Sequence, residues 1–442
     1  MSDQKADAPT HPIEAELRPP ERLAGVLSKI DALYRDEVAP RESKLRHRLT
    51  DERAYLDGDG KLHPEIIEAR REIMRASGQA GVYSLHLPER LGGGGLGRED
   101  MIYAEEKVYG YGVGLNPALL SWSEGATPRL LYCHDHQREQ FVDPLVRGEK
   151  TSLHGVTEEG AGSNLFDMKT RGEKRGGDWI LNGAKAYITN AFDADVAQVL
   201  AITHPGQGRR SFTYFMFDTR EFLDKGYRIG RLYQTMFGDG YTGEIFFDDM
   251  RLPESAVIGE PGQGFDIAVM SFNYTRMRRG GMCSGWSRYL IERSLERVRQ
   301  RQVGNRPLGA NQGIQWMIAD MYIDWLQARS LSLEVARAID TPGPWYALPR
   351  PKDEVRKICA LKVSNDESFH RVADRALQVF GGAGVMRNSD INKLFQIARN
   401  FRIPGGTDEV QRTTIAETLG LRFEPSKSAS DAAGGRDKAG RE

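Results

Sequence analysis

The chain has 442 residues, and its 61 Lys and Arg side chains nearly balance 62 Asp and Glu side chains, so the formal net charge is -1. Without a net positive field, bulk charge gives no reason to expect nucleic-acid or anionic-membrane binding. The mean hydropathy is -0.53, and no apolar run of about 18 residues predicts a membrane span. Three cysteines are too few for a disulfide framework. The N-terminus lacks the basic start and apolar core of a secretory signal. We therefore expect a cytoplasmic protein of several domains.

Apolar spacing and composition divide the chain into five segments. Prolines dominate the first segment, and the last has no Val, Ile, Leu or aromatic residue after its opening positions, so neither is expected to bury a core. Between them, apolar residues recur first at helical spacing, then at strand spacing, then at helical spacing again. We expect a flexible arm, a helical domain, a β domain, a helical bundle and a disordered tail over residues 1–21, 22–150, 151–263, 264–422 and 423–442.

The middle segment is predicted to be a small antiparallel sheet or barrel. An Asn182-Gly183 pair stands between two apolar stretches within 179–189, which is a typical hairpin signal. Further stretches are rich in β-forming residues, namely 196–202, 211–217 and 244–247. The spacing of these stretches and the turn residues between them favour antiparallel pairing over βαβ units.

The third folded segment is predicted to be an antiparallel helical bundle. Helical periodicity marks one helix around 290–298 and a longer one around 314–325. Two further helices are expected around 355–361 and 369–379.

Two short motifs suggest chemistry but favour structural roles. The glycines of 92–97 have the spacing G-x-G-x-x-G, but no strand leads directly into them and no βαβ unit surrounds them. Cys133, His134 and His136 lie together without a second cluster of metal ligands, so we expect a surface turn and no metal.

The segment 155–164, Gly-Val-Thr-Glu-Glu-Gly-Ala-Gly-Ser-Asn, is more informative. Its glycines leave backbone N–H groups accessible, and consecutive N–H groups can cradle an anion such as a pyrophosphate. A plain turn is an equally good reading of this segment alone. About thirty residues later, Tyr187 and Thr189 lie on a predicted strand, where a ring and a hydroxyl could cover and bind a planar group.

These two stretches and four later ones resemble the acyl-CoA dehydrogenase family. TEEGAGSN and LNGAKAYITNA are similar to that family's TEP-x-AGSD and NG-x-K-x-WITN motifs, at a similar separation. The later stretches are FFDDMRLPESAVIGEPGQGF, RQVGNRPLGANQ, QVFGGAG and IPGGTDEVQR, beginning at residues 246, 301, 378 and 403. The resemblance covers about residues 25–422 in the family's order. It implies an α+β fold: an N-terminal helical domain, a middle antiparallel β domain and a C-terminal four-helix bundle.

The resemblance also implies FAD as the cofactor. One set of residues would contact the flavin and pyrophosphate, namely Val156, Thr157, Gly162, Ser163, Tyr187 and Thr189. In this family a neighbouring subunit completes the site, here through Arg301, Gln378, Gly381 and Gly382, while Thr407 and Glu409 would border the cofactor. A site built across subunits implies a homo-oligomer, usually a dimer of dimers. The family passes electrons to an electron-transferring flavoprotein, which is therefore an expected partner.

The family reaction is the α,β-dehydrogenation of an acyl-CoA thioester, and this chain departs from the family at the catalytic base. Most members carry Glu where this chain has Gly405, followed by Gly406. A second group places the Glu on an earlier helix just before an Arg, where this chain has Thr275 before Arg276. A general base is typically worth about 10²- to 10⁴-fold in rate. The backbone N–H of Gly405 remains available to polarise the thioester oxygen.

Three hypotheses remain open. In the first, the chain is an acyl-CoA dehydrogenase that binds substrate near Arg276, Tyr274, Gly405 and Gly406, and its base comes from elsewhere, for example Tyr274, Tyr241 or a carboxylate near Asp239. In the second, the same fold supports other flavin chemistry, such as a monooxygenase reaction. In the third, the chain is a non-catalytic subunit of a heteromeric dehydrogenase. Chain length and branching of the acyl group are not predicted.

Overall fold

The computed structural model describes residue 13 and residues 17–122, 124–339 and 351–421. The predicted tail, 423–442, and most of the predicted arm lie outside the described residues. Within the arm, Ile13 is buried, and the carbonyl oxygen of Leu17 accepts a hydrogen bond of 2.8 Å from Nη2 of Arg329. The described part of the arm is therefore attached to the folded chain.

The N-terminal domain is helical. Its longest helix, α5, begins at Pro64, where a proline fits the first helical turn, and the side chain of His63 caps the N–H of Glu65. Its helices are α1 (Ala24–Leu33), α2 (Ala39–Lys44), α3 (Arg46–Leu49), α4 (Glu52–Tyr55), α5 (Pro64–Gln79), α6 (Arg98–Tyr109) and α7 (Asp143–Val146). The glycine turn before α6 is a structural connection, because a β-carbon at Gly94 would lie 2.8 Å from Leu85.

The middle domain is an eight-stranded sheet in the order β6-β7-β3-β2-β4-β5-β8, with β1 added beside β4. The strands are β1 (Ser152–Gly155), β2 (Arg171–Arg175), β3 (Asp178–Ile188), β4 (Val196–Ile202), β5 (Phe212–Asp218), β6 (Tyr227–Leu232), β7 (Gly243–Pro253) and β8 (Val257–Ile258); the short helix α8 (Thr219–Phe222) follows β5. Most neighbours are antiparallel, as predicted, but β4 pairs in parallel with both β1 and β2. The sheet is therefore mixed.

The predicted hairpin turn at Asn182-Gly183 is wrong. Strand β3 runs straight through this pair, and the turn lies earlier, at Gly176-Gly177 between β2 and β3. The pairing of β3 with β7 shifts register between Leu181 and Gly183, so the pair marks an irregularity of the strand. Gly183 has φ of 141°, and a β-carbon there would lie 2.7 Å from Cα of Thr170. Close approach of two backbones, and not a turn, explains this glycine.

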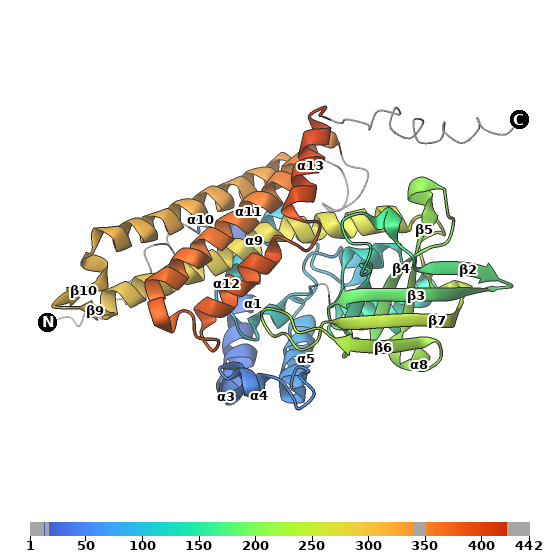
Figure 1. Cartoon of the computed structure of the whole chain (residues 1–442), viewed down its shortest axis with the longest axis horizontal. Helices are drawn as coiled ribbons and strands as arrows, with labels where there is room; N and C mark the ends of the chain where they lie inside the picture. The colour runs from blue at the N-terminus through green and yellow to red at the C-terminus, as the bar shows by residue number, and fades with distance from the viewer. Residues whose placement is uncertain (1–12, 14–16, 123, 340–350, 422–442) are drawn as a thin grey trace, which may run out of the picture.

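The C-terminal domain is a bundle of long helices (Figure 1). They are α9 (Gly264–Gln300), α10 (Gln312–Ala338), α11 (Lys352–Phe380), α12 (Asp390–Phe401) and α13 (Asp408–Thr418), and a two-stranded ribbon of β9 (Gln302–Val303) and β10 (Arg306–Pro307) joins α9 to α10. The two helices predicted between 355 and 379 form the single helix α11, because no glycine or proline interrupts the segment between them.

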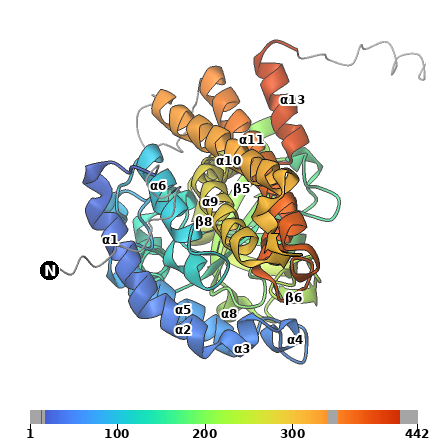
Figure 2. The same cartoon turned by 90° about the vertical axis from the view of Figure 1, so that its left-hand side faces the viewer.

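Helix α9 crosses α6 at close range, and this joins the bundle to the N-terminal domain (Figure 2). A β-carbon at Gly281 would lie 2.5 Å from Cβ of Glu105, and one at Gly285 would lie 2.7 Å from the carbonyl oxygen of Glu106. Only glycine allows this distance between the helices. In the described part of the chain, no helix has the length and apolar character that a bilayer span requires.

Candidate active site at the junction of the β domain and the bundle

The loop that follows β1 is held by a buried ion pair. Oε1 of Glu158 accepts hydrogen bonds from Nζ of Lys185 at 2.9 Å and from the N–H of Thr170 at 2.9 Å. Burial acts to raise the pKa of Glu158, but Lys185 and these hydrogen bonds outweigh it and hold the pKa below its ordinary value. Burial lowers the pKa of Lys185 to about 8 against the attraction of Glu158. The ion pair fixes where the loop from Val156 to Ser163 leaves the sheet.

The two motif stretches, 155–164 and 179–189, lie side by side. The N–H of Ala186 on β3 donates a 2.9 Å hydrogen bond to the carbonyl oxygen of Thr157. Tyr187 then adopts a left-handed φ of 59°, which is unusual for a residue with a bulky side chain. Tyr187 is 53% exposed, and the centre of its ring lies 4.7 Å from the centre of the Tyr233 ring. Strain and an exposed aromatic ring at one position are typical of a binding surface.

This surface fits a flavin nucleotide. Val156 is buried and Thr157 is half-buried at the end of β1, while Gly162 and Ser163 are exposed farther along the loop. A β-carbon at Gly160 or Gly162 would meet nothing within 4 Å, so the backbone there is open to a ligand. Thr189 is half-buried on the neighbouring segment. These residues could hold a planar ring and the adjoining phosphates, as the sequence predicted, and FAD would supply the hydride-accepting ring.

The two positions at which a base was expected meet in space. Gly405 adopts a φ of 76°, and a β-carbon built on it would lie 3.4 Å from Cγ2 of Thr275. Neither residue carries a carboxylate. Within the described part of the chain, the N–H of Gly405 donates no hydrogen bond. The structure thus forms one location from two distant segments, with a free backbone donor and a hydroxyl in place of a carboxylate.

Arg276 and Gln411 hold the glycine loop against α9. Nε of Arg276 donates to the carbonyl oxygen of Gly405 at 2.9 Å, and Nε2 of Gln411 donates to that of Gly406 at 3.0 Å. Burial lowers the pKa of Arg276 from its ordinary value, although a guanidinium stays charged at neutral pH. Arg276 therefore positions the loop, and its predicted contact with substrate remains a proposal.

A buried ionic network anchors the other end of the same loop. Nζ of Lys362 on α11 lies 2.7 Å from Asp408 and 2.8 Å from Asp366, and all three side chains are fully buried. Arg402 bonds the second oxygen of Asp408 at 2.8 Å. Thr407 caps α13 by accepting from the N–H of Val410 at 3.3 Å, and Glu409 is exposed. The segment from Arg402 to Asp408 is thus fixed at both ends.

Tyr274 belongs to a buried polar cluster below Thr275. Its hydroxyl donates to the carbonyl oxygen of Ser121 at 3.3 Å and accepts from Nη1 of Arg278 at 3.0 Å. Arg278 also forms an ion pair with Glu105, and both side chains are fully buried. Burial raises the pKa of Glu105 to about 7 against the attraction of Arg278. Tyr274 is 2% exposed and is committed to this cluster, so its predicted part in substrate binding remains a proposal.

The second set of predicted cofactor residues lies at the opposite end of the bundle. Arg301 directly precedes β9, which Figure 1 places at the far end of the molecule from the sheet. Gln378 is in the last turn of α11, and Gly381 and Gly382 follow it. All four are exposed. Within one chain these residues cannot complete the surface around Tyr187, so any shared site requires a second chain.

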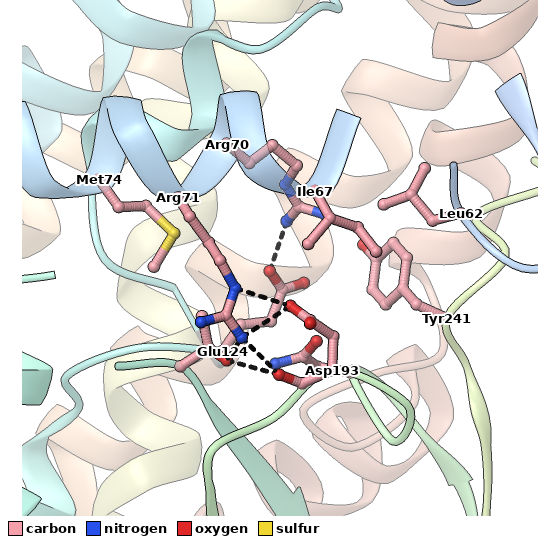
Figure 3. A pocket seen from close by; sticks show the side chains of 10 residues that line it. Leu62, Ile67, Arg70, Arg71, Met74, Glu124, Asp193 and Tyr241 are labelled. Carbon is pink, nitrogen blue, oxygen red and sulfur yellow. Dashed lines mark hydrogen bonds and ion pairs between the residues drawn. The ribbon is translucent and has the colours of Figure 1, made fainter. Parts of the chain in front are cut away.

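A small pocket between α5 and the β domain is lined by residues that include Arg70, Asn190 and Tyr241 (Figure 3). Arg70 forms an ion pair with Glu124 at 2.5 Å, and its guanidinium lies 5.2 Å from the ring centre of Tyr241. Burial and the charge of Glu124 raise the pKa of Tyr241 well above its ordinary value. Tyr241 is therefore protonated at neutral pH and is a poor candidate for the base. Nearby Asp239 is buried and accepts from the hydroxyl of Thr242 at 2.8 Å.

Three residues of this region carried no sequence prediction. Glu158 and Lys185 lie inside the two motif stretches, 27 positions apart, and form an ion pair. Their opposite charges in two stretches expected to lie together were a signal for this pair. Arg129 lies outside any motif, in the 3₁₀ turn Pro128–Tyr132, and is fully buried against β4 and α9. No sequence pattern indicates its burial, because arginine is usually exposed.

Comparison with known proteins agrees with this architecture. Models of the N-terminal, middle and C-terminal domains of acyl-CoA dehydrogenases match residues 30–149, 154–250 and 262–420. The chain is 28% identical over 362 residues to an acyl-CoA dehydrogenase of Bacillus subtilis (strain 168), covering 80% of this chain and 92% of that protein. It is 29% identical over 390 residues to the (R)-benzylsuccinyl-CoA dehydrogenase of Thauera aromatica, covering 87% and 92%.

Solved structures show the same fold. The crystal structure of a putative acyl-CoA dehydrogenase from Mycobacterium smegmatis superimposes with a TM-score of 0.78 at 26% identity, covering 92% of this chain and 99% of that one. Three family domains in order, full-length relatives and a shared fold together decide the family. The chain belongs to the acyl-CoA dehydrogenase family, whose members are FAD-dependent oxidoreductases acting on CH–CH bonds.

Proposed function

We propose that this chain catalyses α,β-dehydrogenation of an acyl-CoA thioester at the junction of the β domain and the bundle. The observation that carries the proposal is the meeting of Gly405 and Thr275, held by Arg276 on α9. The thioester would lie between this location and the flavin, with its oxygen bound by the N–H of Gly405. Such a donor stabilises negative charge that develops on the oxygen as the α-proton leaves.

The cofactor site would be shared between two copies of the chain. In each site, one copy contributes Val156, Thr157, Gly162, Ser163, Tyr187 and Thr189, with Thr407 and Glu409 at its border. The other contributes Arg301, Gln378, Gly381 and Gly382. The distance between the β domain and β9 along the bundle supports this division (Figure 1). We propose a homo-oligomer of paired dimers that passes its electrons to an electron-transferring flavoprotein.

One observation favours a second function. Both expected base positions lack a carboxylate, and Tyr241 and Tyr274 each lie against an arginine. A flavin monooxygenase, or another reaction that removes no α-proton, would need no base there. A non-catalytic subunit that holds half of a flavin site for a partner would also need none, but the retained Arg276 and the flavin motifs favour a catalytic chain.

An anaerobic panel of acyl-CoA thioesters separates these functions. The purified full-length chain, loaded with FAD, is mixed with straight, branched, aromatic and dicarboxylic acyl-CoAs while the flavin absorbance is followed. Loss of the oxidised flavin band with at least one thioester, and formation of the enoyl-CoA, supports dehydrogenation. If no thioester reduces the flavin but the chemically reduced enzyme consumes oxygen with a substrate, the monooxygenase function is supported instead. A chain that holds no FAD contradicts both.

A further inference from the structure

Arg129 is a buried cation that has no counter-ion among the described residues. It is 1% exposed, and its Nε and Nη1 donate to Oε1 of Gln198 at 2.6 Å and to Oγ of Ser271 at 2.7 Å. Its third nitrogen, Nη2, is buried without a hydrogen-bond partner among the described residues. Burial lowers the pKa of Arg129 to about 10, and the groups that oppose the shift are Tyr214, Cys133 and Tyr274, none of them a carboxylate. The side chain is therefore still positive at neutral pH.

The other deeply buried arginines of the described chain differ in this respect. Arg278 is paired with Glu105, and Arg279 lies 3.5 Å from Asp366. Arg329 bonds Glu106 at 2.7 Å. An unpaired charge in a dry interior is costly, and proteins normally neutralise it. A charge that is kept without neutralisation therefore calls for an explanation beyond packing.

Arg129 contacts both elements that border the candidate site, the sheet through Gln198 and α9 through Ser271. Ser271 lies one helical turn before Thr275 on α9, and the hydroxyl of Thr275 donates to the carbonyl oxygen of Ser271 at 3.1 Å. Gln198 on β4 pairs with His154 on β1, and His154 lies two residues before Val156. The guanidinium thus bonds the strand beside β1, whose end leads to Val156, and the turn of α9 just before Thr275.

We infer that the positive charge of Arg129 makes the bound FAD easier to reduce, so that Arg129 is an electrostatic positioning residue of the site. The inference rests on the cofactor placement in the proposed function. Reduction by the substrate brings two electrons onto the flavin ring, and a fixed positive charge in a region of low dielectric lowers the free energy of the more negative redox state. A carboxylate beside the guanidinium would cancel this effect, and the described part of the chain places none there.

The test compares Arg129→Met with Arg129→Lys in the full-length, FAD-loaded chain, and Arg329→Met is the matched control because it removes a buried arginine on α10 that has its own carboxylate. The midpoint potential of the bound FAD is measured against a reference dye. For Arg129→Met, we expect the equilibrium to shift at least about tenfold toward the oxidised cofactor, or about 30 mV for a two-electron couple. Arg129→Lys and the control should each stay within about threefold of the wild type, or about 15 mV.

The second measurement is the melting temperature of the chain after removal of FAD. It does not depend on the cofactor. Arg329→Met leaves the carboxylate of Glu106 buried and unpaired, whereas Arg129→Met leaves only neutral acceptors. Arg129→Met should therefore lower the melting temperature less than the control does.

An unchanged potential in Arg129→Met would overturn the inference, and so would a larger loss of melting temperature than in the control or failure of the variant to fold. A wild-type chain that binds no FAD would instead contradict the proposed function. In that case the melting comparison would still test whether Arg129 is a costly charge.

Discussion

Thr275 and Gly405 are 130 residues apart in sequence, yet a β-carbon on Gly405 would lie 3.4 Å from Cγ2 of Thr275. A carboxylate side chain on either residue would therefore extend from nearly the same point. Thr275 lies on the helix α9, and Gly405 lies on a loop. This relationship accounts for how two positions could serve one reaction. In this chain both lack the group, while Arg276 still holds the loop in place.

Installing a carboxylate on the helix should create a base. Thr275→Glu places it on regular α-helical backbone, and we expect the rate of flavin reduction by a thioester that binds to rise by about 10²-fold or more. Stopped-flow reduction under anaerobic conditions measures this rate. Thr275→Gln is the matched control, because it has the same shape but cannot accept the proton. Equal rates in the Glu and Gln variants would show that the missing base does not limit this enzyme. Gly405→Glu is a weaker choice, because its φ of 76° would strain any side chain.

The shared cofactor site can be tested by complementation between subunits. Gly162→Trp would place a bulky ring on the exposed loop from Val156 to Ser163, at a position where a β-carbon meets nothing within 4 Å. Arg301→Glu would reverse the charge at the other end of the bundle. Each variant alone should lose FAD. A mixed dimer has one site with both changes and one with neither. Because random association makes about half of the dimers mixed, co-expressed variants should regain about a quarter of the wild-type FAD. Absorbance per chain after gel filtration measures it. No recovery in the mixed dimer would place both sets of residues in separate sites.

The buried ion pair between Glu158 and Lys185 should contribute far more to stability than the exposed ion pair of neighbouring Glu159 with Arg231. Glu158→Leu leaves Lys185 buried without its partner carboxylate, which should lower the free energy of unfolding by about 3 kcal/mol. It should also weaken FAD binding, because the loop loses its anchor. Glu159→Leu is the matched control: Glu159 is 76% exposed at the side chain and lies 3.7 Å from Arg231, so its loss should cost less than about 0.5 kcal/mol. Denaturant unfolding and FAD titration measure the effect of each variant. Equal losses of stability and of FAD affinity in the two variants would contradict the structural role of Glu158.

Glu105 should make stability depend on pH. Burial raises its pKa in the folded chain from an ordinary 4.5 to about 7. Between these values the folded chain keeps a proton that the unfolded chain has released, so stability falls as the pH rises through this window. Glu105→Gln cannot titrate. Its free energy of unfolding relative to the wild type should therefore rise between pH 4.5 and 7, by up to about 3 kcal/mol. Urea unfolding at several pH values measures the difference, and a difference that stays flat with pH would contradict the buried, titrating carboxylate.

Local patterns predicted the class of each domain, because apolar spacing reports which face of a helix or strand is buried. They failed where a tertiary contact changes the meaning of a local signal. Asn182-Gly183 has the composition of a turn, but its glycine is required by the backbone of Thr170. In the same way, the segment between 361 and 369 looked like a break between helices, yet it carries Lys362 and Asp366, which are buried partners inside one helix.

The site was predictable only as far as motifs extend along the chain. The motifs predicted cofactor contacts for Thr157 and Tyr187, and the structure brings their segments together through the hydrogen bond from Ala186 to Thr157. Arg129 could not be assigned, because nothing local distinguishes a buried arginine from an exposed one. Its burial depends on Gln198 and Ser271, which arrive from two other domains.

The sequence by itself determined the order of the domains, the family and the absence of a carboxylate at Gly405 and Thr275, because these depend on residue identity and spacing along the chain. The tertiary structure alone decided that these two positions share one location. It also decided that β9, next to Arg301, lies at the opposite end of the molecule from β3, which carries Tyr187, and that Arg129 has no counter-ion among the described residues. Distance and burial are properties of the folded chain, because they are set by contacts between residues that are remote in sequence.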